Sequence, residues 1–82
     1  MRLKPTWNNV LMALNGAPGW VGGHMLPDGN GRTGCARGDV LSAMRKAGVI
    51  EYGKEPAHSH YGWRITAEGH RVLSQGIHPE PA

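Results

Sequence analysis

The sequence predicts a small α+β domain in which about three helices pack with a two- or three-stranded antiparallel sheet. Apolar residues recur at helical spacing in residues 6–14, 33–47 and 67–74. Residues 49–52 and 61–66 are rich in aromatic and β-branched side chains, and the eight residues between them are typical of a hairpin with a long tip. Because a chain of 82 residues has a single core, we expect one domain over 1–75 and a flexible tail over 76–82.

The first helix is predicted over residues 6–14 because its apolar side chains follow one another at three-, four- and seven-residue spacing and so share one face. These side chains are Trp7, Val10, Leu11 and Leu14. We expect the Thr6 hydroxyl to cap the first turn, after an extended Pro5. Asn15 and Gly16 predict a left-handed exit from the helix.

Residues 16–34 contain seven glycines and two prolines, a density that argues against any long helix or strand. Within this segment, residues 20–21 predict a short strand and residues 24–26 a single helical turn. The chain is expected to reverse at residues 27–29 because proline and Asp-Gly favour turns. The segment is therefore predicted to consist mostly of turns.

The next helix is predicted over residues 33–47, with Thr33 as its cap or, if the glycines in its first turn fray it, with Asp39 as its start. One face of this helix is apolar and the opposite face is offered to solvent or a ligand. The apolar face consists of Val40, Leu41, Met44 and Ala47, and the polar face of Ser42, Arg45 and Lys46. Gly48 lies where a left-handed C-cap is expected, and Val49 can fold back onto Met44 in a Schellman motif.

Alternation along the second strand of the hairpin predicts which side chains point inward. Trp63 and Ile65 are expected to face the core, on the same side as Tyr61, whereas Arg64 points outward. Thr66 ends this strand and is expected to cap the last helix with its hydroxyl.

Two phrases of this chain, residues 40–50 and 61–73, resemble the bacterial winged helix regulators. In those families the reading helix ends in a Leu-x-x-x-Gly-Leu-Ile type of phrase, which residues 44–50 match. The second wing strand runs into a Leu-Thr-x-x-Gly phrase, which residues 65–69 match.

Residues 19–23, followed by Arg37, are also similar to small phage and prophage winged helix proteins. The resemblance implies a winged helix fold that binds double-stranded DNA. It places the helix after Thr33 in the major groove and the hairpin tip on the flanking backbone or minor groove. This chain departs from the family where the second helix belongs, a helix that normally supports the reading helix and touches the phosphates.

Positive charge gathers in the half of the chain that holds the second predicted helix and the hairpin. Residues 32–64 contain six Lys or Arg against three Asp or Glu, an excess equal to the +3 of the whole chain. Such a region favours an anionic partner such as nucleic acid. The candidate DNA-binding residues are Arg32, Arg37, Ser42, Arg45, Lys46, Lys54, His58, His60 and Arg64.

These candidates differ in the contact that each could make. Arg45 suits a guanine edge and Lys46 a phosphate, with Ser42 beside them. Arg32 and Arg37 precede or open the helix, where the helix dipole and free amides favour a phosphate. At the hairpin tip, Lys54, His58 and His60 could lie along a phosphate backbone. This contact would strengthen as the histidines protonate near their usual pKa of about 6.5. The alternative for each is an ordinary solvated surface side chain.

Several other classes of function are disfavoured by the sequence. The conceivable metal ligands by position are His24, Cys35, His58 and His60, but no Cys-x-x-Cys or His-x-x-x-His pair is present, so we expect no metal or cofactor. Cys35 lacks a base within its own phrase, and we expect no enzyme. The sequence contains no apolar run of the roughly 18 residues that a membrane span needs and no leader-like start, so we expect a cytoplasmic protein with no membrane partner.

Two hypotheses follow from the sequence. The first is a winged helix protein that binds double-stranded DNA, a transcriptional or phage regulator that acts by occupying a site, alone or as a homodimer on a two-fold site. The alternative is a protein-interaction module on the same scaffold, such as a phage-encoded modulator of host machinery. In that alternative, Trp20 is an exposed anchor for the host protein partner.

Overall fold

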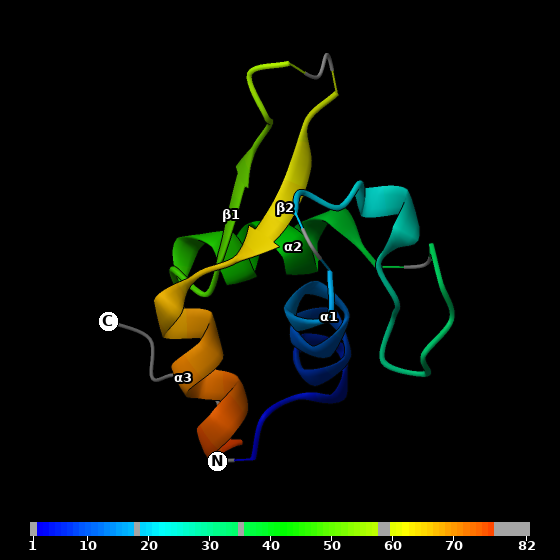
Figure 1. Ribbon diagram of the computed structural model, residues 1–82. Coiled ribbons are helices and arrows are strands. Elements are labelled where there is room, and N and C mark those ends of the chain that lie inside the picture. The colour runs from blue at the N-terminus through cyan, green and yellow to red at the C-terminus, as the bar shows by residue number, and fades with distance from the viewer. Residues whose placement is uncertain (1, 18, 35, 58–59, 77–82) are drawn as a thin grey trace.

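The computed structural model describes residues 2–17, 19–34, 36–57 and 60–76. Within these residues the chain forms three α-helices, α1 (Pro5–Asn15), α2 (Gly38–Lys46) and α3 (Ala67–Gln75), and a short 3-10 helix, η1 (Gly23–Met25). Strands β1 (Ile50–Gly53) and β2 (Gly62–Ile65) pair as an antiparallel hairpin. In Figure 1, α1 and α3 lie beside each other, α2 runs behind the base of the hairpin, and the hairpin projects beyond the helices. The predicted α+β class is confirmed.

Helix α1 buries the four apolar side chains that the spacing selected, but its ends differ from the prediction. It begins at Pro5, because proline has no N–H to leave unpaired at the first helical position and its φ is already helical. Thr6 therefore lies inside the helix and does not cap it. Gly16 is right-handed, with φ −84°, because its N–H still donates to the Met12 carbonyl 3.2 Å away.

Helix α2 starts later than the prediction from Thr33, close to the alternative start at Asp39. Thr33 forms an isolated bridge with Pro27 and caps no helix. The reason is a pair of backbone hydrogen bonds: the N–H groups of Gly34 and Ala36 both donate to the Leu26 carbonyl, at 2.9 and 3.2 Å. These bonds hold Gly34 and Ala36 against the backbone at Leu26, and α2 has no side-chain cap.

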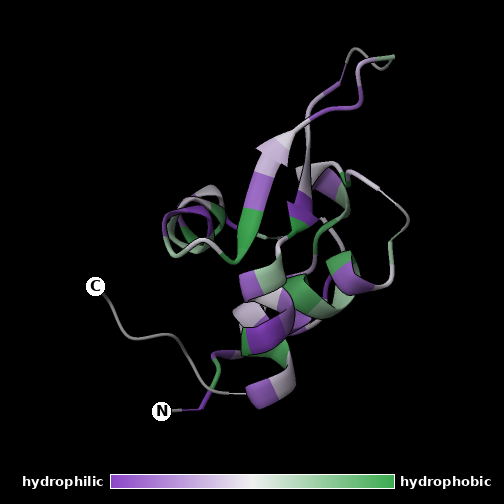
Figure 2. Ribbon diagram, turned by 60° about the vertical axis from the view of Figure 1, so that its left-hand side comes forward, coloured by the Kyte–Doolittle hydropathy of each residue, from purple (hydrophilic) through white to green (hydrophobic). Residues whose placement is uncertain are grey.

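The C-terminal end of α2 is a complete Schellman motif, as predicted. Gly48 has φ +80° and donates its N–H to the Arg45 carbonyl at 3.0 Å. Val49 donates its N–H to the Met44 carbonyl at 3.2 Å, and its side chain is fully buried. The chain therefore turns sharply from α2 into β1, which rises from the end of α2 in Figure 2.

The hairpin register determines which residues share a side of the sheet. The directly opposed pairs are Ile50 with Ile65, Glu51 with Arg64, Tyr52 with Trp63 and Gly53 with Gly62. Ile50 is buried, and Ile65 and Trp63 pack against the core, which confirms the predicted inner side. A possible third strand is reduced to Val21, which exchanges two backbone hydrogen bonds with Trp63 at 2.7 and 2.8 Å.

Helix α3 begins where the sequence predicted and ends one residue later. The Thr66 hydroxyl oxygen accepts from the Gly69 N–H at 3.0 Å, the expected N-cap. Gly76 ends the helix with φ +68°, and its carbonyl accepts from the Leu3 N–H at 2.9 Å, so the start of the domain lies against the end of α3. The rest of the predicted tail, 77–82, lies outside the described residues.

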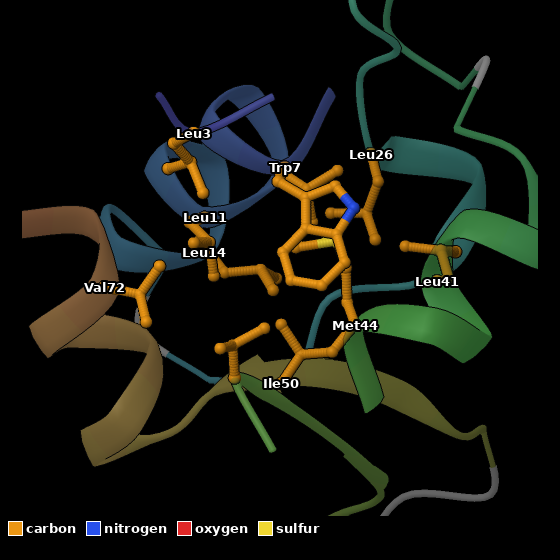
Figure 3. Packing of buried hydrophobic residues seen from close by; sticks show 11 residues of the cluster. Leu3, Trp7, Leu11, Leu14, Leu26, Leu41, Met44, Ile50 and Val72 are labelled. Atoms are coloured by element: carbon orange, nitrogen blue, oxygen red, sulfur yellow. The ribbon is translucent and has the colours of Figure 1, made fainter. Parts of the chain in front are cut away.

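One apolar core joins the three α-helices and the hairpin. Figure 3 shows Trp7 of α1 in the middle of the cluster, with Leu26 and Leu41 on one side and Met44 below it. Leu26 is fully buried although it lies in the glycine-rich segment, so this segment is part of the core. None of the helices within the described ranges is long and apolar enough to cross a membrane.

We expect Gly69→Ala to destabilise the protein, although alanine in place of glycine usually stabilises a helix by up to about 1 kcal/mol. A Cβ at Gly69 would collide with the Val49 carbonyl oxygen and lie 2.7 Å from Ile65 Cγ1. Helix α3 must then move away from the hairpin, at a cost of about 1–3 kcal/mol. Urea unfolding followed by tryptophan fluorescence measures the loss.

The matched control is Gly38→Ala, which is also a helical substitution. A Cβ at Gly38 would meet no atom within 4 Å, so this variant should be as stable as the parent or more stable by up to about 1 kcal/mol. Equal effects of the two substitutions would contradict the close approach of α3 to the hairpin.

Candidate nucleic-acid interface

The outer face of α2 presents three of the predicted site residues to solvent. Ser42, Arg45 and Lys46 are exposed, whereas Leu41 and Met44 on the opposite side of the helix are buried. The spacing of the apolar residues produces this division, because Leu41 and Met44 are three positions apart and so lie on one side of the helix. This face can therefore contact a ligand without any change in the core.

Arg45 lies on the edge of α2 that faces the hairpin. Its guanidinium carbon is 5.8 Å from the centre of the Tyr52 ring in β1. This distance is within the range of a cation–π contact, which keeps the cation beside the hairpin. The structure thus brings the outer face of α2 and the hairpin together at Arg45.

Two tyrosines continue this surface along the hairpin. The rings of Tyr52 and Tyr61 are stacked, with centroids 5.2 Å apart and planes 16° from parallel. Trp63 lies on the same side, its ring centroid 4.6 Å from that of Tyr52 and tilted by 50°. Tyr52 is 43% exposed and Tyr61 56% exposed. Alternation places Tyr61 on the inner side of the hairpin, but the hairpin extends past the core at this point.

Arg64, another predicted site residue, lies on the opposite side of the hairpin from Arg45. Its Nε donates to Glu51 Oε1 at 2.7 Å, and the two side chains form an ion pair. Its guanidinium carbon is also 4.3 Å from the centre of the Trp20 ring. The structure therefore does not bring Arg64 to the surface formed by α2 and the tyrosines.

Trp20 packs on this second side of the hairpin and is half-buried. The opposed pair Gly53 and Gly62 makes room for it: a Cβ at Gly53 would lie 2.8 Å from the Trp20 ring, and one at Gly62 would lie 3.0 Å from the Val21 backbone. Trp20 thus covers the hairpin of its own chain and is not the free anchor that the alternative hypothesis expected.

The two arginines before α2 occupy different environments. Arg37 forms an ion pair with Asp39 at 3.2 Å, and both side chains are largely exposed. Arg32 is exposed in the loop before α2. The phosphate contact predicted for these two arginines stays a prediction.

The hairpin tip contains the remaining predicted residues. Lys54 is half-buried directly after β1, His60 is exposed before β2, and His58 lies outside the described residues. His60 and Tyr61 line an open cleft of about 590 Å³ between the hairpin and the glycine-rich segment, together with His24 and Glu55.

Within the described ranges, no three His, Cys, Asp or Glu side chains are grouped so that they could hold a metal ion. Cys35, a ligand considered from the sequence, lies outside those ranges.

The loop that carries Arg32 is held by the side chain of Asp28. One carboxylate oxygen of Asp28 accepts from the backbone N–H groups of Asn30 and Arg32, both at 2.9 Å. The Asn9 side chain of α1 donates to the Asp28 carbonyl at 2.9 Å. The backbone N–H of Arg32 lowers the pKa of the Asp28 carboxyl below its usual value, with smaller help from Asn30.

A comparison of this chain with protein-family models, curated proteins and solved structures found no match.

We expect Asp28→Asn to weaken the pH dependence of stability in acid. Because the folded pKa of Asp28 is lowered, its charge stabilises the fold above the unfolded pKa of about 4, and this stabilisation is lost as the pH falls through the folded pKa. The difference in stability between parent and variant should therefore shrink between about pH 5 and pH 2. Thermal unfolding across this pH range measures it, and parallel curves for the two proteins would contradict the role of Asp28.

Proposed function

We propose that this protein binds double-stranded DNA as a winged helix protein of the regulator type. The order of elements supports this assignment: a first helix, a bridging residue in place of the first strand, η1, α2, a hairpin and a last helix. Here η1 stands where the family has its second helix, reduced to three residues. In this assignment α2 is the reading helix and the β1–β2 hairpin is the wing.

The proposal is supported by the cations on α2, which have no carboxylate partner among the described ion pairs. Among the described ion pairs, Arg37, Arg64 and Arg71 have carboxylate partners, whereas Arg45 and Lys46 have none. No carboxylate in these pairs competes with a partner for either cation, and both lie on an exposed face of α2. The diameter of an α-helix with its side chains is about the width of the major groove. A guanidinium here suits a guanine edge, and the ammonium of Lys46 suits a phosphate.

The same placement suggests how the protein docks. With α2 in the groove, the hairpin runs along the flank of the duplex, where Lys54 and His60 reach the backbone. A three-residue η1 offers fewer phosphate contacts than a full helix, so a single copy should bind weakly. Two copies on a two-fold site would double the contacts, and the protein would act by occupying that site.

A second candidate function, binding of another protein, is favoured by the large apolar side chains at the surface. Met12 on α1 and Met25 on η1 are more than half exposed, in addition to the two tyrosines. Flexible methionines and exposed aromatics are typical of protein-binding surfaces. A partner retained from host lysate after nuclease treatment, together with no affinity for DNA, would support this candidate over the first.

We expect affinity for duplex DNA to fall steeply with salt and to depend on Arg45. Loss of one phosphate contact in Lys46→Ala should reduce the slope of log affinity against log salt by about 0.9, whereas Arg45→Ala should lower the affinity by about tenfold. Fluorescence anisotropy with a labelled duplex at two salt concentrations measures both effects.

The control is Arg71→Ala, which removes one positive charge from α3 and frees Glu68. It changes the net charge of the protein as much as Arg45→Ala does, but it lies outside the proposed interface. If the affinity for duplex DNA does not change with salt concentration, α2 is rejected as the DNA-binding surface. It is also rejected if Arg45→Ala and Arg71→Ala lower this affinity equally.

A further inference from the structure

If α2 alone contacts the duplex, the stacked rings of Tyr52 and Tyr61 make no contact with the DNA. The two rings are the exposed aromatics of the hairpin, at 43% and 56% exposure, within the described chain. The two side chains pack on each other, because their rings lie nearly parallel with centroids 5.2 Å apart. An ordered apolar surface of this kind indicates a flat binding partner.

Tyr52 is held from three directions. Tyr61 stacks against it, Trp63 packs beside it at 4.6 Å, and the Arg45 guanidinium lies 5.8 Å from its ring centre. Tyr61 is the outer member of this group, since its described ring contact is with Tyr52 alone. The group therefore forms a continuous series from the cation of α2 to the ring of Tyr61, which is more than half exposed.

The hairpin that carries these rings is supported on its other side. Trp20 packs against Gly53 there, and Val21 is hydrogen-bonded to Trp63 along the edge of β2. The tyrosine pair is thus ordered before any partner binds, which reduces the entropy lost on binding.

The neighbouring charges indicate the chemistry of the partner. Arg45 and Lys46 favour an anion, whereas an aromatic ring face favours a flat apolar group, and a nucleotide combines both. Inside a duplex the faces of the bases are covered by stacking on their neighbours. A ring can stack on a base face only at a duplex end or where one strand is unpaired.

We propose that the Tyr61 ring stacks on an unpaired base of the bound DNA, so that the protein prefers a duplex that adjoins a short single strand. This inference rests on the proposed function, because it uses α2 to hold the duplex part. Arg45 contributes to both contacts. It binds the duplex, and it packs against Tyr52, on which Tyr61 stacks.

The test compares a blunt duplex with the same duplex carrying a tail of about five unpaired nucleotides, each titrated by fluorescence anisotropy. The parent protein should bind the tailed duplex about tenfold more tightly than the blunt one. Tyr61→Leu should remove this preference, so that the variant binds the tailed duplex no more tightly than the blunt one. Tyr61→Phe should keep the preference, because the ring and not the hydroxyl makes the contact.

A second readout places the contact at the base. A 2-aminopurine in the first unpaired position should lose fluorescence when the parent protein binds and keep it with Tyr61→Leu. Thermal unfolding of Tyr61→Leu should match the parent, since the side chain is more than half exposed.

The outcomes that overturn this inference differ from those that overturn the proposed function. Equal affinity of the parent for blunt and tailed duplexes, with Arg45 still required, would reject the stacking role, leave duplex binding intact and favour a protein partner for the two rings. A Tyr61→Leu variant that weakens both duplexes equally would reject it too. No affinity of the parent for either duplex would reject the proposed function itself.

Discussion

The turn between α2 and the hairpin sets the angle between the two parts of the candidate interface. Gly48 reverses the chain with a positive φ, and the Thr66 hydroxyl then donates to the Gly48 carbonyl at 2.5 Å. Thr66 also donates its N–H to the Val49 carbonyl and caps α3 through Gly69. One residue thus connects the end of α2, the start of the hairpin and the start of α3, and a change there would move Arg45 away from Tyr52.

The hairpin has two sides with different roles. The side toward α2 begins with the buried Ile50 and continues, beyond the core, into the exposed tyrosines. The other side is covered by Trp20 and closed by the ion pair of Arg64 with Glu51. Arg64 is therefore paired with a carboxylate of its own hairpin, whereas Arg45 has no carboxylate partner among the described ion pairs.

Local physics explains which elements could be predicted. The Schellman turn at Gly48 and the cap at Thr66 depend on residues within five positions of each other, so the sequence is enough to find them. The start of α2 could not be found in this way, because the Leu26 carbonyl holds Gly34 and Ala36 from a distance of eight to ten residues. Helix α1 begins one residue before the predicted start, because Pro5 fits the first helical position, where its missing N–H leaves no hydrogen bond unmade.

The sequence by itself determined the α+β class, the buried face of α1, the burial of Leu41 and Met44 on α2, the inner side of the hairpin and the exposure of Ser42, Arg45 and Lys46. All of these follow from periodicities of 3.6 and 2 that are local to one element. The tertiary structure decided which cations are free, that Trp20 covers the hairpin, and that Tyr52 and Tyr61 stack. The tyrosine stacking depends on the strand register across the long tip. The position of Trp20 depends on where the glycine-rich segment packs. The glycines of that segment allow many backbone conformations, and the burial of Leu26 in the core selects one of them.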